Sequence, residues 1–105
     1  MDAQLRKGLL EFCVLAAIRK KDSYGYQMIK DISEYIEISE STLYPILRRM
    51  EAGGKVESYS VVYQNRIRNY FHLTEVGKEY LDGFQKEKEE ITRILAFIVG
   101  GIEDE

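Results

Sequence analysis

Residue types that support enzymatic or metal chemistry are scarce in this chain of 105 residues. It contains one cysteine, one histidine, one proline and no tryptophan. A single cysteine excludes a disulfide within one chain, and one Cys with one His cannot form the clusters that hold structural metals. The sequence also has no glycine-rich phosphate loop and no nucleophile with an obvious base. It therefore predicts a protein that is not an enzyme and uses no metal or cofactor.

Both single residues are expected to be structural. Cys13 lies in the apolar stretch 9–18, where a buried thiol behaves as a small hydrophobic side chain rather than as a redox switch. His72 lies in a predicted strand, which favours a structural role over a catalytic or metal-binding one.

Apolar runs long enough to cross a membrane are absent. Glu11 interrupts the first apolar stretch, and the charged residues 19–22 stand where a signal peptide would need small ones. A second apolar run, 94–102, is too short to span a bilayer. We expect a soluble, cytoplasmic protein with no membrane partner.

The net charge of −3 is unevenly distributed along the chain. Residues 1–73 hold 11 Lys or Arg and 9 Asp or Glu, a charge of +2, whereas residues 74–105 hold 4 and 9, a charge of −5. The acidic excess is thus confined to the C-terminal part. The mildly basic remainder predicts modest nonspecific affinity for nucleic acid and binding by two copies together.

The segment 39–51 has two chemically different faces when it is placed on a helix. Its apolar residues fall on one narrow stripe: Leu43, Ile46, Leu47 and Met50. The other side carries hydroxyl and guanidinium groups, which suit phosphate oxygens and base edges: Ser41, Thr42, Pro45, Arg48 and Arg49. This pattern predicts a DNA recognition helix, although two arginines on an exposed helix face are also compatible with simple solvation.

Two helices are predicted before this segment. The first covers about 4–20 and is apolar nearly all round from Leu9 to Ile18, so we expect it to contact a second subunit as well as its own core. The next begins at Ser23 as N-cap and carries apolar residues at helical spacing to Ile36. Ser39 is expected to cap the third helix, which stops at the glycines 53–54. The order is helix, short turn, helix.

Residues 56–73 change from helical to strand periodicity. The runs 56–63 and 68–73 predict a β-hairpin whose tip is 64–67. Arg66 and Arg68 at such a tip, beside a helix-turn-helix, indicate a wing that reaches phosphates or the minor groove. A plain hairpin with solvated arginines is the alternative.

A last helix is predicted to begin at the cap residue Thr74. From there residues recur at alternating spacings of four and three: Leu81, Phe84, Lys88, Ile91, Leu95, Ile98 and Ile102. One long helix could not bury this heptad stripe alone, so we expect it to join two protomers, although packing onto its own domain is the alternative. The predicted dimer contacts are Leu9, Phe12, Leu81, Phe84, Ile91, Leu95 and Ile98.

These elements together predict a mainly α fold with a small β-hairpin. A winged helix-turn-helix DNA-binding domain over 1–73 would precede a C-terminal dimerisation helix over 74–105. A two-fold dimer would present its recognition helices to successive major grooves of a pseudo-palindromic site, roughly 34–36 Å apart. A small hydrophobic or aromatic effector could enter between the first and last helices, near Phe12, Leu15, Phe84, Ile91 and Leu95, although a fully packed interface is the alternative.

Two motifs at their observed separation carry a family resemblance. The run Thr-Leu-Tyr-Pro at 42–45, and the run Tyr-Phe-His-Leu-Thr-Glu-Val-Gly at 70–77, resemble PadR-type transcriptional regulators over about residues 5–81. The resemblance implies a dimeric winged helix-turn-helix repressor of genes for detoxification, efflux or phenolic-acid metabolism. It places DNA contacts on Ser39, Ser41, Thr42, Tyr44, Pro45 and Arg48, and wing contacts on Asn65, Arg66 and Arg68.

Some residues depart from the family pattern. Ser41 stands where the family often has glycine, and the wing is poorer in Gly, Arg and Lys than is common. Tryptophans that stack aromatic drugs in short members are missing, which puts a stacking pocket in doubt. Pro45 lies beyond the first helical turn, where we hypothesise that it bends the helix to present neighbouring side chains to DNA. The acidic balance and plain wing also permit a second function, a winged-helix dimer that binds a protein partner without binding DNA.

Overall fold

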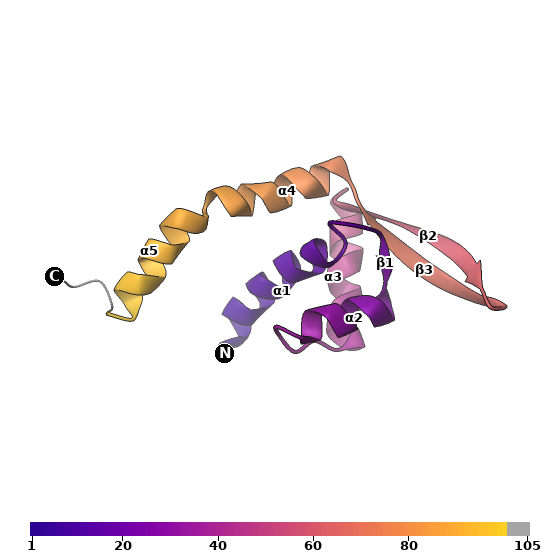
Figure 1. The fold of residues 1–105 in the computed structure, drawn as a ribbon, viewed down its shortest axis with the longest axis horizontal. Coiled ribbons are helices and arrows are strands. Elements are labelled where there is room, and N and C mark those ends of the chain that lie inside the picture. The colour runs from indigo at the N-terminus through magenta and orange to yellow at the C-terminus, as the bar shows by residue number, and fades with distance from the viewer. Residues whose placement is uncertain (101–105) are drawn as a thin grey trace.

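The computed structural model describes residues 1–100 as a helical domain with a small sheet (Figure 1). The elements follow in the order α1 (Ala3–Ala17), β1 (Ser23–Tyr24), α2 (Gly25–Ser33), α3 (Glu40–Ala52), β2 (Val56–Tyr63), β3 (Arg66–Leu73), α4 (Glu75–Lys86) and α5 (Lys88–Ile98). The predicted mainly α fold with a β-hairpin is confirmed. The first helix ends three residues earlier than predicted, at Ala17.

The core lies where α1, α2 and α3 meet the sheet. It includes the fully buried side chains of Val14, Leu15, Met28 and Val56. The predicted apolar stripe of α3 completes it, since Leu43, Ile46, Leu47 and Met50 are all buried. Each such side chain stabilises the fold by roughly 1.5–3 kcal/mol through removal of apolar surface from water. The orientation of α3 is therefore fixed from its apolar side.

The sheet has the strand order β1-β3-β2, and both pairings are antiparallel. Strands β2 and β3 pair along their whole lengths, from Val56 opposite Leu73 to Tyr63 opposite Arg66. Gln64 and Asn65 alone form the turn, with φ of 51° and 63°. Positive φ at both positions is the type I′ geometry that matches the twist of paired strands. The predicted tip 64–67 is therefore wrong in length, because Arg66 and Ile67 belong to β3.

The start of the second helix also differs from the sequence prediction. Ser23 is buried in β1 opposite Phe71 and does not cap a helix. Helix α2 begins at Gly25, after Tyr24, and ends at Ser33 rather than near Ile36. Pairing with β3 draws Ser23 into the sheet, which a local capping rule does not anticipate.

Two other predicted helix caps hold their positions. Thr74 caps α4, since its hydroxyl accepts a hydrogen bond from the Gly77 N–H at 3.1 Å. Ser39 is the N-cap residue of α3, and its carbonyl accepts the N–H groups of Thr42 and Leu43. Its hydroxyl, however, lies 3.0 Å from the Ser41 hydroxyl and caps no backbone N–H. A cluster of side-chain hydroxyls thus lies at the N-terminus of α3.

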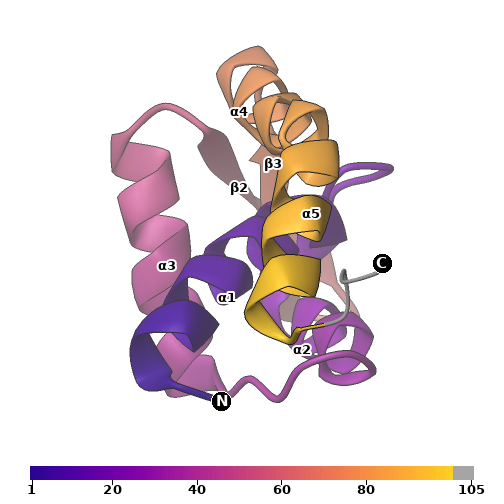
Figure 2. The same ribbon diagram turned by 90° about the vertical axis from the view of Figure 1, so that its left-hand side faces the viewer.

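The predicted single C-terminal helix is two helices. Helix α4 ends at Lys86, and α5 starts at Lys88 and runs away from the core (Figures 1 and 2). The Glu87 N–H donates to the Phe84 carbonyl at 3.0 Å, a tightened final turn. Every residue from 85 to 90 is polar, so this stretch offers no apolar side chain to hold the two helices in line. Ile102, the last member of the predicted heptad stripe, lies outside the described residues.

Two glycines of α4 should respond oppositely to substitution by alanine. A Cβ at Gly77 would lie 2.2 Å from the Lys55 carbonyl oxygen, whereas one at Gly83 would meet nothing within 4 Å. We predict that Gly77→Ala lowers the free energy of unfolding by about 1–3 kcal/mol through overpacking. Gly83→Ala should raise it by roughly 0.5–1 kcal/mol through helix propensity. Urea unfolding measures both, and equal effects of the two changes would contradict the packing described.

Candidate nucleic-acid interface

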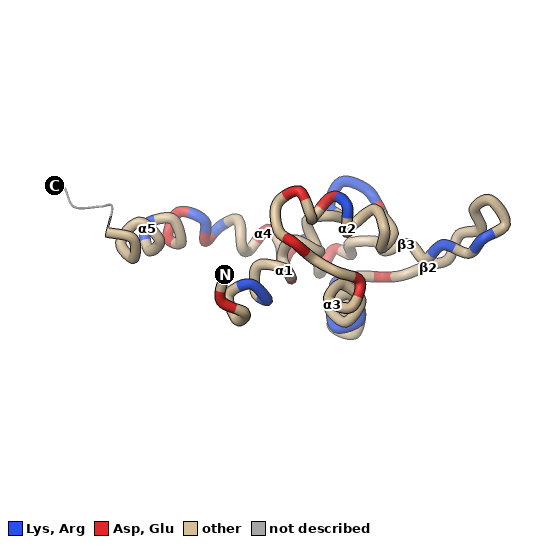
Figure 3. The backbone as a smooth tube through the Cα atoms, turned by 90° about the horizontal axis from the view of Figure 1, so that it is seen from below, with Lys and Arg blue, Asp and Glu red and all other residues tan. Residues whose placement is uncertain are grey.

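Burial of the apolar stripe turns the opposite side of α3 outward. Ser41, Thr42, Arg48 and Arg49 are exposed there, and Pro45 is half-buried within a helix that continues through it. We call these five residues the recognition face. Lys and Arg segments lie on α3 and on the outer part of the β2–β3 hairpin (Figure 3). Both elements that the sequence predicts to bind DNA thus carry exposed arginines, although Glu40 and Glu51 balance the charge of α3 as a whole.

The two arginines of the recognition face have different surroundings. Arg49 donates to the Glu11 carboxylate of α1 at 2.8 Å, with 47% of the arginine side chain exposed. Within residues 1–100, the structure shows no ion-pair partner for Arg48. Half-exposed ion pairs contribute little stability, yet the pair partly neutralises Arg49. Arg48 is therefore the better placed of the two to bind a phosphate or a base.

Tyr44 faces α2 rather than solvent alone. It is half-buried, and a Cβ added to Gly25 would lie 2.1 Å from the Tyr44 hydroxyl oxygen. The first residue of α2 must be small for the ring to lie there. Tyr44 thus has a packing role at the junction of α2 and α3, beside any contact that its hydroxyl makes.

A groove of about 570 Å³ separates α3 from the hairpin formed by β2 and β3, which we call the wing. Its walls carry four tyrosines and two arginines. Tyr26, which is 66% exposed, was not among the predicted site residues. The lining residues are Tyr24, Tyr26, Glu40, Tyr44, Tyr63, Gln64, Arg66, Ile67, Arg68 and Asn69. We call this the wing groove.

Arg68 does not point freely from the wing as its position near the tip suggested. Its guanidinium carbon lies 4.0 Å from the ring centre of Tyr24 and 4.3 Å from that of Tyr63. The Tyr70 side chain, one further ring on this face, raises the pKa of Arg68, so the guanidinium stays charged. Arg66, closer to the turn, is exposed.

A second groove, also about 570 Å³, runs between α1 and α3. It brings much of the recognition face together with Arg6 and Lys7 of α1, which sequence reasoning did not assign to the site. Arg6 donates to the Glu37 carbonyl in the α2–α3 connection. A charge count along α1 alone gave no signal, because the juxtaposition depends on how α1 crosses α3.

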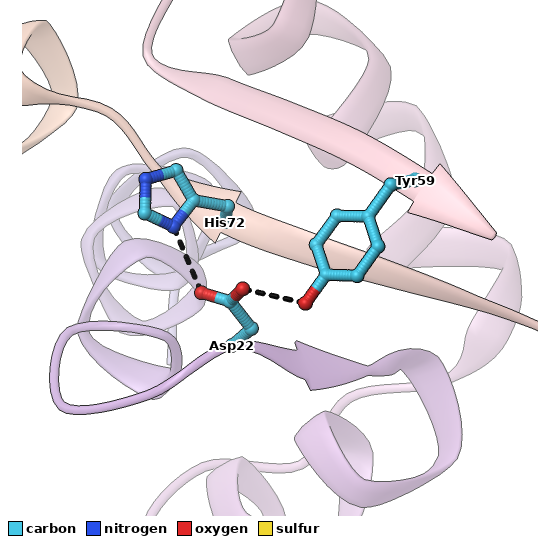
Figure 4. Close-up of polar contacts among 3 residues, drawn as sticks. All are labelled: Asp22, Tyr59 and His72. Carbon is cyan, nitrogen blue, oxygen red and sulfur yellow. Dashed lines mark hydrogen bonds and ion pairs between the residues drawn. The ribbon is translucent and has the colours of Figure 1, made fainter. Parts of the chain in front are cut away.

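An acidic residue links β1 to the base of the wing. One Asp22 carboxylate oxygen accepts the Tyr59 hydroxyl at 2.6 Å, and the other lies 2.8 Å from Nδ1 of His72 (Figure 4). The hydrogen bond from Tyr59 and then the interaction with His72 lower the pKa of Asp22 below its ordinary value. His72 thus has a structural position, and residues 1–100 contain no group of three potential metal ligands.

The predicted dimer and effector residues divide between the core and the surface. Leu15 and Leu81 are buried in the core of the protomer. Phe12 packs against Phe84 in a tilted arrangement, with ring centres 4.3 Å apart. Leu9 and Ile91 are half-buried, whereas Leu95 and Ile98 of α5 are 56% and 68% exposed. Part of the heptad stripe therefore packs within the protomer, whereas Leu95 and Ile98 are left largely uncovered by residues 1–100.

The remaining surface and core features add little to the site. Cys13 packs against the core, and burial raises the pKa of its thiol. That position agrees with the expected inert role.

Among residues 1–100, every helix falls short of the length and apolar character that crossing a membrane requires.

Comparison with known proteins decides the family. The model of the PadR-like family of transcriptional regulators matches residues 14–83. The chain belongs to this family. The crystal structure of smu.1704 from Streptococcus mutans UA159 is 37% identical and has a TM-score of 0.79, with 94% of each chain covered. A PadR family regulator from Clostridium difficile R20291 is 28% identical, with a TM-score of 0.80 over 88% of this chain and 99% of its own.

A curated relative supports the same assignment. The transcriptional regulator Rv3488 of Mycobacterium tuberculosis is 25% identical over 91 residues, which cover 86% of this chain and 85% of the relative. PadR-like proteins are DNA-binding transcriptional regulators and not enzymes. The expectation of a winged helix-turn-helix regulator is therefore confirmed at the level of family and fold.

The lowered pKa of Asp22 predicts a pH-dependent contribution to stability. Since the folded-state value lies below the ordinary value of 3.8, the ionised carboxylate stabilises the fold above that pH. The contribution is lost as the pH falls through the folded-state pKa. We expect Asp22→Asn to cost about 1 kcal/mol at pH 7 and progressively less in acid. Thermal unfolding at several pH values measures this, with Asp82→Asn as the exposed control, and a constant difference from wild type at all pH values would contradict it.

Proposed function

We propose that this PadR-family protein is a homodimeric repressor that inserts α3 of each protomer into the major groove of a pseudo-palindromic operator. The observation that carries the proposal is the division of α3. Its apolar stripe is buried in the core, and its hydroxyl and guanidinium groups lie outside. Arg can donate two hydrogen bonds to guanine, and Ser or Thr can bind phosphate oxygens. The helix thus presents the chemistry of sequence recognition on a fixed support.

The wing supplies a second contact to the same duplex in this proposal. Arg66 and Asn65 at its end would bind phosphates or the adjoining minor groove. Ser39, Ser41, Thr42, Tyr44, Pro45 and Arg48 would lie at the major groove, with Arg49 supporting them through its pair with Glu11. The open wing groove gives the DNA backbone a place between the two elements.

Pairing of protomers through the C-terminal part is supported by the surface of α5. Five of its apolar side chains or those just after it are about half or more exposed: Ile94, Leu95, Phe97, Ile98 and Val99. So large an apolar face on a short helix is typical of a protein interface. We propose that residues 1–73 bind DNA and residues 74–105 join the protomers, with Leu9 and Phe12 of α1 at the same junction.

Regulation by a small hydrophobic effector is also proposed, at the junction of protomers. In the protomer, Leu15 is fully buried, and the rings of Phe12 and Phe84 pack against each other and leave no room for a ligand between them. A binding space would therefore form between Phe84, Ile91 and Leu95 of one chain and the second chain. Genes of detoxification, efflux or phenolic-acid metabolism are the proposed targets.

Removing Arg48 of α3 together with Arg66 of the wing should strongly weaken operator binding. We predict that Arg48→Ala combined with Arg66→Ala weakens binding to the protein's own upstream DNA by roughly 100-fold or more, since one base contact alone is worth about 1–3 kcal/mol. Quantitative gel shifts at two salt concentrations measure the loss, and wild-type affinity should fall steeply with salt.

The control is Arg19→Ala combined with Lys20→Ala, which removes the same charge. These residues lie in the connection between α1 and β1, on the other side of the domain from α3 (Figures 2 and 3). The control should bind the operator within a few-fold of wild type. Equal losses in both double variants would show nonspecific attraction only, and no binding by wild type would favour the protein-interaction module.

Dimerisation should depend on the apolar face of α5. We predict that Leu95→Lys yields particles of the single-chain mass, 12.3 kDa, where wild type gives twice that value. Light scattering after size exclusion measures both. Glu89→Lys, on the opposite side of α5, adds a lysine without touching the apolar face and should leave the dimer intact. A Leu95→Lys protein that stays dimeric would place the interface elsewhere.

A further inference from the structure

The outer part of the wing has unusually little support from the sheet. Strand β1 pairs with β3 only at Phe71 and Tyr70. From Asn69 to the turn, the wing is a ribbon of two strands that projects from the domain (Figure 1). Two-stranded ribbons are marginally stable in water and twist more freely than wider sheets. Something other than backbone pairing must hold this part at a defined angle.

Arg68 provides such a link. Its side chain lies on the same face of the sheet as Tyr24 of β1 and Tyr63 at the end of β2, with the guanidinium between their rings. Tyr24 also packs against Tyr70, with ring centres 5.4 Å apart, so its ring is held from the domain side. A planar cation between two aromatic faces is attracted by both. The stack therefore joins the unsupported ribbon to the strand that leads into α2.

This stack also borders the wing groove. Tyr24, Tyr63 and Arg68 all line it, and Tyr44 of α3 lines it from the other side. A change in the angle of the ribbon would move Arg66 relative to the recognition face, because both arginines lie on β3. The width of the groove thus depends on the contact between Arg68 and the two rings.

We propose that Arg68 is a positioning residue: it fixes the wing against Tyr24 and sets the width of the wing groove, while Arg66 makes the contact with the DNA phosphate. The proposal rests on the proposed DNA-binding function for its consequence, but the fixing of the wing is a property of the free protein. It also departs from the expectation that Arg68 itself contacts DNA.

The first test uses the protein without DNA. Hydrogen exchange of the backbone amides of 60–69 reports how often the ribbon opens. We expect Arg68→Ala to speed exchange there by roughly tenfold, the order of loss for aromatic contacts with a cation. Tyr63→Leu should speed exchange as Arg68→Ala does. Tyr63→Phe should exchange at the wild-type rate because it keeps the ring, and so should Arg66→Ala. Unchanged exchange in Arg68→Ala would overturn the proposal.

The second test separates positioning from direct contact through the salt dependence of operator binding. Operator affinity falls as salt rises, and each lost phosphate contact makes the slope of log affinity against log salt less steep by about 0.9. We expect Arg66→Ala to make the slope less steep. Arg68→Ala should weaken binding roughly tenfold but keep the slope of wild type. Adding Tyr63→Leu to Arg68→Ala should cause no further loss, since both remove one stack. If Arg68→Ala makes the slope less steep to the same extent as Arg66→Ala, the proposal is overturned.

The two tests also distinguish failure of this inference from failure of the proposed function. If wild type binds no DNA, the proposed function fails, and the exchange measurement on the free protein still decides whether Arg68 holds the wing. If wild type binds its operator and exchange in Arg68→Ala stays slow, the inference alone fails.

Discussion

Burial of one stripe of α3 is the constraint on which the rest of the interface depends. Leu43 and Leu47 are almost completely removed from water, so the helix cannot rotate without exposing them. This packing turns the hydroxyls and guanidinium groups of the other side outward, and the ion pair of Arg49 with Glu11 is added to it. Helix α2 and the sheet pack against the same stripe, and this packing places the wing beside the exposed face of α3. The position of the proposed DNA-binding surface thus follows from the packing of the core.

The wing is held by a different set of forces. Its base is anchored by Asp22, which joins Tyr59 and His72 to the strand before α2. Farther out, backbone pairing with β1 ends, and aromatic contacts with Arg68 take over. Both links run to β1 or to the residue directly before it. A strand of two residues therefore fixes where the wing stands relative to α3.

Local patterns predicted the elements of this fold well, and long-range contacts explain the differences. The stripe of α3, the paired strands and the Thr74 cap follow from periodicity and capping chemistry that lie within a few residues. Ser23 entered a strand because a segment nearly fifty residues later pairs with it. The link from Arg49 to Glu11 and the stack around Arg68 join distant parts of the chain, so no local pattern reveals them. The heptad spacing predicted one continuous helix, and it did not show that the helix is interrupted within the polar run 85–90.

Protection of guanine N7 in the operator tests the central claim most directly, because N7 lies in the major groove. If the protein binds as the proposed dimer, methylation protection with wild type should show two protected patches on one face of the duplex, centred about 10–10.5 base pairs apart. Arg48→Ala should lose protection in both patches together, since the two protomers are equivalent. A single protected patch, or protection only of minor-groove positions, would contradict the account.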